Sequence, residues 1–334
     1  MKVTIREIAK QAGVSPTSVS QVLNGKEIRI TEEKKNKIYQ VARELNYVSD
    51  GQAEEKQKKN RLIGLVVPDI VNPYFSQMAK VIITELEKTG RNVLITDSDN
   101  RMEQDISNLK ELRKKRVEGI IFAPSGESAG EIEKLIYKIM EKDRIPLVLL
   151  DRDNAEYNCH SVMVDHFRGG YLATEHLISQ GHRKIGCITG PMYLETAVQR
   201  FQGYKNACRE AGILEEEQVI ACGDYQIRSG YENCPRLLES GVTAIFACND
   251  MMAYGAYNYL KEQKIGVPEE ISLIGFDDIF FSEIMGVELT TIRQPIEDIG
   301  TRAVQMLLED RNEREKKRSV FQPYLVCRST TKKR

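Results

Sequence analysis

The chain of 334 residues lacks the long hydrophobic runs that a membrane-spanning helix needs, because no stretch of about 18 or more apolar residues occurs in it. Its N-terminus also lacks the charged and then apolar segment of an export signal. The seven cysteines form no C-x-x-C pair and lie near no histidine cluster, which argues against a zinc site and favours reduced thiols. We therefore expect a cytoplasmic protein that binds no metal.

The sequence also lacks the motifs of the common enzyme classes. It contains no P-loop, no G-x-S-x-G and no metal-ligand spacing, so we expect neither catalysis nor a bound cofactor. The one carboxylate pair of interest, Asp277 and Asp278, follows an apolar run and is interpreted as a ligand contact. Cys187, Cys222 and Cys248 lie in or beside apolar runs, and we interpret them as core residues rather than nucleophiles.

The net charge of −1 is unevenly distributed along the chain. Residues 1–60 hold 12 basic and 8 acidic residues, a net charge of +4, which leaves −5 on the remainder. A mildly basic head on an acidic body permits contact with phosphates, and two copies on one duplex would double the effect.

The first 48 residues have the pattern of three short helices. Thr4 and Glu7 form a capping box at the start of the first helix, and Gly13 supplies the turn after it. Ser15 then caps a second, more polar helix. Two short helices joined by such a turn form a shape that fits a DNA major groove. The residues expected to face inward are Ile5, Ile8, Ala9, Val19, Val22, Leu23, Ile38, Val41 and Leu45.

This stretch resembles the DNA-binding domain of the lactose-repressor (LacI-type) family of bacterial transcription regulators. The resemblance rests on TIREIA at 4–9, AGVS at 12–15, VS at 19–20, VLN at 22–24 and LNY at 45–47. The alternative is a small helical cap on a larger enzyme. Within the family pattern, Pro16, Thr17 and Gln21 would contact bases, with Gln21 suited to adenine where arginine is common. Other members of the expected DNA-binding set are Thr4, Ser15, Ser20, Asn24, Tyr47, Ala53 and Lys56.

The linker at 49–61 departs from the family pattern. Family members usually form a short hinge helix there, from which a leucine wedges into the minor groove and kinks the duplex. Ala53 suits that helix, but Lys56 occupies the leucine position and Glu54 replaces a commonly basic residue. We expect weaker operator bending than is typical, and Lys56→Leu should tighten binding. The alternative is a solvated, charged linker.

After residue 60, apolar strand-like runs alternate with amphipathic stretches, which predicts parallel sheets covered by helices on both faces. There are more predicted strands and helices than one sheet usually holds. We therefore expect an all-α helix-turn-helix head followed in sequence by an α/β core of two doubly wound parallel-sheet sub-domains. The expected strands lie at 62–67, 93–95, 119–122, 146–150, 184–188, 244–247, 271–275 and 324–326, and the helices at 75–88, 102–114, 171–180, 197–211 and 251–263. The expected domains are 1–48 for DNA binding, 49–61 as hinge, 62–160 with 291–322, and 161–290 with 323–330.

Residues 62–330 resemble the effector-binding core that this family shares with the periplasmic sugar-binding proteins (type I). The matching motifs are GLVVPD at 64–69, NPYF at 72–75, VEGII at 117–121, ITGP at 188–191, RFQGY at 200–204, FACND at 246–250, GFDD at 275–278 and LTTIRQP at 289–295. Ligands of open α/β sheets bind beyond the carboxyl ends of the strands, where this chain places carboxylates, amides, arginines and aromatic rings.

Within the family the core looks most like ribose repressors. The resemblance implies an effector site of Asn72, Tyr74, Phe75, Asp151, Arg152, Arg200, Tyr225, Asn249, Asp277 and Gln294. The expected effector is a monosaccharide, ribose or a related pentose or small hexose. Tyr74 and Tyr225 stand where the pattern has phenylalanine, and each adds a hydroxyl, which is a departure from the ribose pattern. For Asn249 and Asp250 the alternative is capping of the following helix.

These residues predict a sugar-responsive repressor that binds two-fold operator DNA as a homodimer through its core. Sugar in the cleft would favour one angle between the sub-domains and so change operator affinity. No heptad tail follows the last strand, so a coiled-coil tetramer is not expected. A transport receptor would need an export signal and no DNA-binding head. A regulator of the same fold that answers to a phosphorylated protein or another small effector remains the alternative.

Overall fold

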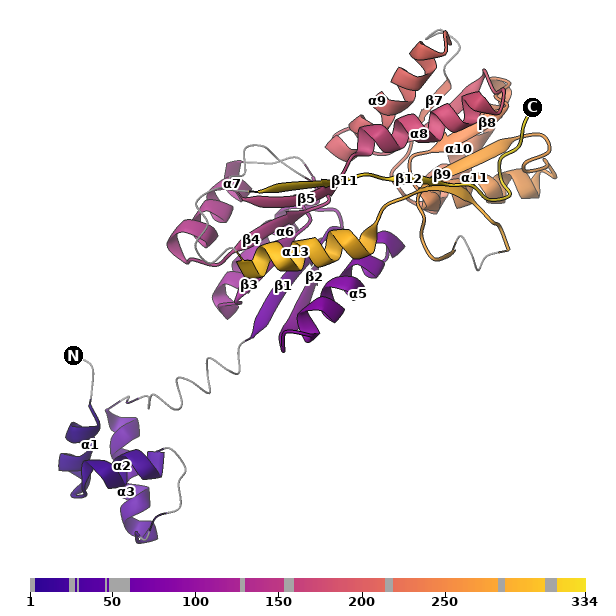
Figure 1. The fold of residues 1–334 in the computed structure, drawn as a ribbon. Helices are drawn as coiled ribbons and strands as arrows, with labels where there is room; N and C mark the ends of the chain where they lie inside the picture. Colours follow the sequence, from indigo (N-terminus) through magenta and orange to yellow (C-terminus); the bar gives the residue numbers. More distant parts are fainter. Residues whose placement is uncertain are drawn as a thin grey trace. The chain divides into compact units, whose positions relative to one another are not determined.

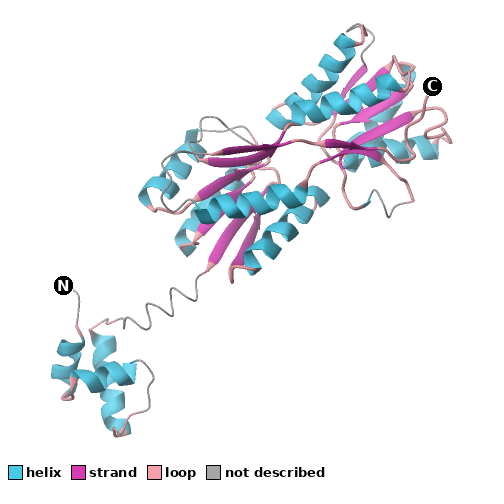
Figure 2. Cartoon of the chain, in the orientation of Figure 1, coloured by secondary structure: helices cyan, strands magenta, loops and turns pink. Residues whose placement is uncertain are grey.

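The computed structural model describes residues 4–23, 28, 30–45, 47, 61–126, 130–152, 159–213, 219–281, 286–309 and 317–334. The chain divides into two compact units, Met1–Arg61 and Leu62–Arg334, which are described separately (Figure 1). In the described part of the chain, no helix is long and apolar enough to cross a membrane. Figure 2 shows that the N-terminal unit is helical and that the larger unit combines helices with two sheets.

The N-terminal unit consists of α1 (Ile5–Ala12), α2 (Pro16–Leu23) and α3 (Glu32–Glu44). The predicted capping box is present. The Thr4 N–H and the Thr4 hydroxyl donate to the Glu7 carboxylate at 2.7 Å and 3.0 Å, and these two hydrogen bonds lower the Glu7 pKa. Gly13 ends α1 with φ of 67°, a conformation that glycine adopts without strain. The expected inward-facing residues form one small core, in which Ile5, Leu23 and Leu45 are only half-buried.

The first sheet has the strand order β11-β5-β4-β3-β1-β2 and is parallel throughout. Helix α13 packs beside α5 on one face, and α6 and α7 cover the other (Figure 1). We call this sheet, together with the helices that cover it, the first lobe. Its elements are β1 (Leu62–Val67), α5 (Pro73–Glu87), β2 (Asn92–Asp97), α6 (Met102–Lys115), β3 (Gly119–Phe122), α7 (Gly130–Tyr137) with the π-helical turn Lys138–Lys142, β4 (Leu147–Leu150), β5 (His160–Val164), α13 (Ile296–Glu309) and β11 (Arg318–Phe321).

The second sheet has the order β12-β10-β9-β8-β6-β7, in which only β12 runs antiparallel. Helices α8 and α9 pack as one pair and α10 and α11 as another. This is the second lobe. Its elements are α8 (His166–Ser179), β6 (Ile185–Thr189), α9 (Glu195–Glu210), β7 (Val219–Cys222), α10 (Ile227–Glu239), β8 (Ala244–Ala247), α11 (Asp250–Glu262), β9 (Ser272–Asp277), β10 (Thr290–Arg293) and β12 (Tyr324–Val326).

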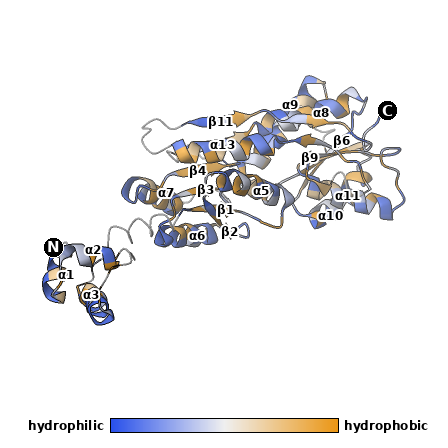
Figure 3. Ribbon diagram, turned by 60° about the horizontal axis from the view of Figure 1, so that its bottom comes forward, coloured by the Kyte–Doolittle hydropathy of each residue, from blue (hydrophilic) through white to orange (hydrophobic). Residues whose placement is uncertain are grey.

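The chain passes between the lobes after β5, after β10 and between β11 and β12 (Figure 1). Two predicted boundaries are therefore wrong by a few residues. The boundary at 160/161 cuts β5 off from the first sheet, and the boundary at 290/291 assigns most of β10 to the first lobe although it pairs with β9 in the second. Hydropathy follows the layers, with the central strands mostly apolar and the outer helix surfaces mostly polar (Figure 3).

Candidate functional site

A cavity of about 290 Å³, including its opening to solvent, lies where the carboxyl ends of strands from both lobes meet. The start of α5 and the residues after β4 contribute from the first lobe. Helix α9, the residues after β7 and β8, and the last residue of β9 contribute from the second. Parallel strands of a sheet end at the same edge, so residues far apart in sequence converge there. The lining residues are Asn72, Tyr74, Phe75, Asp151, Arg152, Thr196, Arg200, Tyr225, Asn249 and Asp277.

Three lining residues have unusual backbone conformations. Asp151, Tyr225 and Asp277 have φ of 65°, 69° and 116°, in the region that favours glycine. Residues held in this region often cluster at ligand sites, where the surrounding structure compensates for the strain. Asp151 and Asp277 adopt this conformation at the ends of β4 and β9, and Tyr225 adopts it three residues after β7.

Asp151 is a buried carboxylate that the first lobe contributes to the cavity. The Tyr74 hydroxyl donates to its Oδ1 at 3.0 Å, and burial raises the pKa of Tyr74 well above its usual range, so the hydroxyl stays protonated. Arg152 Nε lies 3.8 Å from the other oxygen, and Arg152 Nη1 donates to the Pro124 carbonyl at 2.6 Å. The Arg152 guanidinium also lies 5.8 Å from the centre of the Phe75 ring. The hydroxyl of Tyr74 is therefore engaged within the protein.

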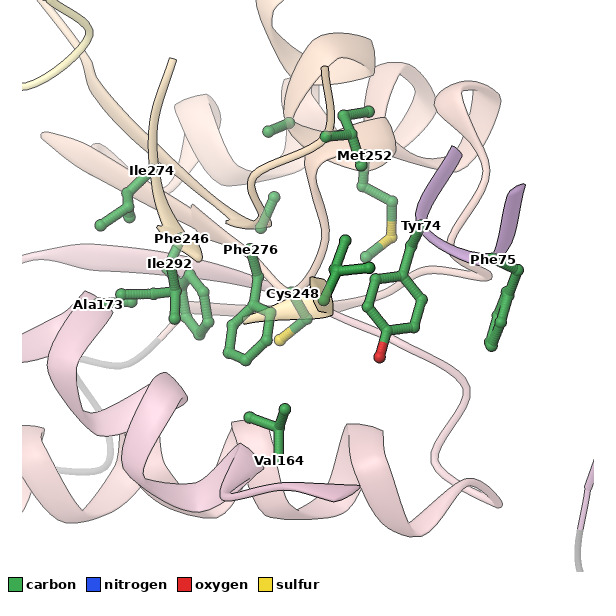
Figure 4. Close-up of a cluster of buried hydrophobic side chains, with 14 of the residues drawn as sticks. Tyr74, Phe75, Val164, Ala173, Phe246, Cys248, Met252, Ile274, Phe276 and Ile292 are labelled. Carbon is green, nitrogen blue, oxygen red and sulfur yellow. The ribbon is translucent and has the colours of Figure 1, made fainter. Parts of the chain in front are cut away.

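Arg200 is the buried cation of the second lobe and is 5% exposed. Its Nη1 donates to the Cys248 carbonyl at 2.5 Å and lies 3.5 Å from Asp277 Oδ1. Its guanidinium carbon is 3.8 Å from the centre of the Phe276 ring, a cation–π geometry. Gly170 permits this placement, because a Cβ on it would lie 2.0 Å from the Arg200 carbonyl oxygen. Figure 4 shows Phe276 and Cys248 in the same buried cluster as Tyr74 and Phe75.

Asp277 ends β9 and is 3% exposed. Burial raises its pKa to about 7, and the carboxylates Asp151 and Asp278 add to the rise, while Arg200 and a hydrogen bond from Gln294 oppose it. The Gln294 amide donates to Asp277 Oδ1 at 2.8 Å. A carboxyl group poised near pH 7 can accept hydroxyl hydrogen bonds as the ionised form.

Tyr225 and Asn249 play different parts at the cavity. The Tyr225 hydroxyl is buried and has no hydrogen-bond partner of acceptable geometry among the described residues, and burial raises its pKa to about 12. Asn249 caps α11 by accepting from the Met252 N–H at 2.9 Å, and it donates to the Tyr225 carbonyl at 3.0 Å. The capping interpretation is thus confirmed for Asn249, which reaches the cavity as well.

The neighbouring carboxylates Asp250 and Asp278 do not line the cavity. Asp250 accepts from the Ile279 N–H at 2.9 Å and the Thr291 hydroxyl at 2.6 Å. Asp278 pairs with Arg328 at 2.7 Å and with Arg293. The expectation that the Asp277–Asp278 pair as a whole contacts ligand is therefore wrong for Asp278, which is held inside the lobe.

The structure brings nine of the ten predicted effector residues to one cavity. The tenth, Gln294, is buried against Asp277 beside the lining residues. Their role in effector binding stays a prediction. The sequence analysis missed Thr196, although it lies four residues before Arg200 and so on the same face of α9. It also missed His166, which contacts Arg200.

The predicted reading helix α2 presents Pro16, Thr17 and Gln21 to solvent, while Ser20 is half-buried. Ser15 caps the helix by accepting from the Ser18 N–H at 3.1 Å. In the same unit, Thr4 is exposed and Tyr47 packs against the core. The predicted contacts Asn24, Ala53 and Lys56, and with them Glu54, lie outside the described residues.

The seven cysteines are unpaired. Cys187 and Cys248 are buried as predicted, whereas Cys222 is exposed at the end of the edge strand β7, so its assignment to the core is wrong. In the described part of the chain, no group of three His, Cys, Asp or Glu residues could hold a metal ion.

Comparison with known proteins identifies both units. Residues 4–50 match the family described as bacterial regulatory proteins, lacI family, and residues 174–331 match a periplasmic binding protein-like domain. The HTH-type transcriptional regulator DegA of Bacillus subtilis (strain 168) is 34% identical over 337 residues, which cover 99% of this chain and 98% of that protein. The chain belongs to the LacI family. It is therefore a sequence-specific DNA-binding transcriptional regulator with an effector-binding core, and not an enzyme.

Solved structures agree with the fold of this LacI-family protein. A LacI family regulator from Enterococcus faecium with bound ribose is 32% identical, with a TM-score of 0.75, and covers 82% of this chain and 99% of its own. The lac repressor dimer bound to operator and the anti-inducer ONPF is 26% identical, with a TM-score of 0.75, and covers 99% of this chain and 100% of its own. The predicted fold, an N-terminal helix-turn-helix head followed in sequence by an α/β core of two sheets, is thus confirmed.

Proposed function

We propose that this LacI-family protein is a cytoplasmic, sugar-responsive repressor. Its core binds a monosaccharide, ribose or a related pentose or small hexose, and the bound sugar changes the affinity of the N-terminal helices for operator DNA. One observation carries the proposal: polar and aromatic side chains from both lobes converge on a single cavity at the carboxyl ends of the strands. A ligand that touches both lobes can shift the balance between their arrangements.

The chemistry of the cavity suits a neutral polyol. Asp151 and Asp277 supply acceptors for hydroxyl groups, and Arg152 and Arg200 supply donors. Two carboxylates beside two guanidiniums leave little net charge, which disfavours an anionic effector. Phe75 offers an aromatic face to the apolar side of a sugar ring. The ribose bound by the similar regulator from Enterococcus faecium supports the same class of effector.

The DNA-binding proposal rests on the exposed face of α2. Pro16, Thr17 and Gln21 lie in solvent at the positions from which the second helix of a helix-turn-helix contacts bases. We propose that Ser15, Ser20 and Asn24 contact phosphates, with Thr4, Tyr47, Ala53 and Lys56 completing the interface. Two copies are needed to read a two-fold operator, and the operator-bound lac repressor is a dimer. We keep 1–48 as the DNA-binding segment and 49–61 as the hinge.

Calorimetric titration with D-ribose, D-xylulose, D-glucose and D-ribose 5-phosphate tests the effector. We expect heat with at least one neutral monosaccharide and at least a hundredfold weaker binding by Arg200→Met, because that variant leaves Asp277 without its cation. The matched control is Arg302→Met, which removes an arginine of α13 that pairs with Glu309 away from the cavity. No heat with any neutral sugar would contradict the proposal.

Selection of operator sequences from a random DNA library tests the coupling. The neutral sugar that binds the core should change operator affinity about fivefold or more. Operator binding that ignores every sugar, but responds to a phosphorylated protein, would favour the alternative regulator of the same fold.

A further inference from the structure

His166 lies where the chain first passes from one lobe to the other. It is the first residue of α8, one residue separates it from the end of β5, and its side chain is 3% exposed. The preceding residue, Asp165, donates its N–H to the Phe321 carbonyl at the end of β11. His166 is therefore anchored at the crossing between the lobes, directly beside a second crossing segment.

One ring nitrogen of His166 is engaged with the second lobe. Arg200 Nε donates to His166 Nδ1 at 3.3 Å. Because Nδ1 accepts, the proton of the neutral imidazole lies on Nε2. Burial and the charge of Arg200 lower the pKa of His166 to about 3, so the ring is neutral at physiological pH.

The other ring nitrogen faces the first lobe without a completed hydrogen bond. His166 Nε2 is buried and makes no hydrogen bond of normal geometry to another described residue, although the nearby Asp151 backbone and carboxylate oppose part of the fall in its pKa. Asp151 Oδ1 lies 3.8 Å away, beyond the upper limit of about 3.2 Å for an N–H···O bond. That oxygen accepts from Tyr74, and a carboxylate oxygen has room for a second donor.

We propose that His166 is a positioning residue for effector binding, which fixes Arg200 in the second lobe and donates to Asp151 in the first lobe when the lobes close on a sugar. The inference rests on the proposed effector site and deepens it. A buried N–H without an acceptor is unfavourable, so an arrangement of the lobes that supplies the acceptor is favoured.

The packing of α8 against α9 explains why the two contacts respond differently to closure. A Cβ on Gly170 would lie 2.0 Å from the Arg200 carbonyl oxygen, and one on Gly203 would lie 2.2 Å from the Phe167 carbonyl oxygen. The backbones of the two helices are thus in direct contact, which fixes the distance from His166 to Arg200. Asp151 follows β4 of the first lobe, whereas His166 begins a helix of the second lobe, so the separation of these two side chains is the one of the two contacts that can respond to a movement of the lobes.

The test compares two variants of His166 by calorimetry with D-ribose. His166→Phe keeps a flat ring but removes both polar contacts, and we expect at least tenfold weaker binding. His166→Gln retains an acceptor for Arg200 and a donor for Asp151, and we expect affinity within threefold of the unmodified protein. If His166→Phe binds D-ribose as tightly as the unmodified protein, the proposal is overturned.

His160→Phe is the matched control. His160 is also buried, lies on β5 and accepts from the Lys317 N–H at 3.0 Å, away from the cavity residues. Its loss should lower the melting temperature without changing D-ribose affinity. Equal weakening by His160→Phe and His166→Phe would show a merely structural role and overturn the proposal.

A second readout does not depend on the identity of the sugar. Spin labels at Lys114→Cys on α6 and Arg228→Cys on α10 report the distance between the lobes, since both side chains are exposed. The exposed Cys222 and Cys327 are replaced by serine. His166→Phe should shift the sugar-free distribution away from the closed form, and His160→Phe should not. An unchanged distribution in His166→Phe overturns the proposal even if no sugar binds, whereas absent sugar binding alone contradicts only the proposed effector.

Discussion

The affinity of the core for a neutral sugar should rise as the pH increases from 6 to 8. Burial raises the pKa of Asp277 to about 7, with Asp151 and Asp278 adding to the rise and Arg200 and Gln294 opposing it. A sugar hydroxyl that donates to Asp277 favours the ionised carboxylate, so binding lowers its pKa and releases a proton.

The size of the effect follows from the fraction of Asp277 that is ionised. With a pKa of about 7, this fraction is about one tenth at pH 6, one half at pH 7 and nine tenths at pH 8. Sugar affinity should therefore increase roughly tenfold between pH 6 and pH 8. Up to about half a proton should be released per sugar bound at pH 7. Calorimetry in phosphate and in Tris buffer at the same pH measures that proton directly, because the two buffers differ in ionisation heat.

Two variants separate Asp277 from other titrating groups. His166 has a pKa of about 3 and stays neutral throughout this range. Asp277→Asn should bind more weakly and lose the pH dependence. Asp250→Asn changes a buried carboxylate that does not line the cavity, so this variant should keep the pH dependence of sugar affinity. Affinity that is constant between pH 6 and pH 8, or proton uptake on binding, would refute the reasoning.

The free energy of unfolding of the sugar-free protein should change with pH in the opposite direction to sugar affinity, because Asp277 stabilises the folded state less as the pH rises. The folded-state pKa of Asp277 lies above its ordinary value of 3.8, so the folded protein holds the proton more tightly than the unfolded chain does. The resulting stabilisation is complete below about pH 4 and is lost as the pH rises through 7. Urea denaturation of the unmodified protein and of Asp277→Asn should differ in slope against pH over this window.

Three further predictions follow from single contacts. Tyr74→Phe removes the hydrogen bond to Asp151, which should lower the free energy of unfolding by about 1 kcal/mol and free an acceptor, so that D-ribose binds more tightly in calorimetry. Gly190→Ala places a Cβ 2.2 Å from the Tyr225 ring, so it should weaken sugar binding at least tenfold, and unchanged affinity would contradict the placement of that ring. Ile38→Ala, in the core of the N-terminal unit, should cost about 2–5 kcal/mol and abolish operator binding while sugar binding persists.

Local patterns in the sequence predicted the elements whose burial is uniform. The central strands β1, β3 and β8 are almost wholly buried apolar runs, and they were placed within a residue. Strand β5 was missed because it begins with His160 and Ser161, whose burial depends on a tertiary contact with Lys317. Helix α10 was missed although it is amphipathic, and Pro235 in its interior is a residue that usually ends a helix.

The same limits explain which site residues could be predicted. Residues that follow recognised strands, such as Asp151 and Asn249, were placed correctly at the cavity. His166 follows β5, so failure to identify that strand concealed the only histidine that touches Arg200 among the described residues. Gln294 was predicted as an effector residue, but it hydrogen-bonds to Asp277 and does not line the cavity. Its position depends on how β10 pairs with β9, which no local sequence pattern reveals.

The two adjacent carboxylates at the end of β9 have different roles, which the family resemblance could not distinguish. Asp277 and Asp278 have φ of 116° and 59°, and such conformations typically cost about 1–3 kcal/mol each. Asp278 binds Arg293 at the end of β10 and Arg328 after β12, while Asp250 accepts the N–H of Ile279. These contacts hold the loop after β9 from both sides. Because these contacts fix its neighbours to the second lobe, Asp277 can keep its unfavourable backbone conformation and line the cavity.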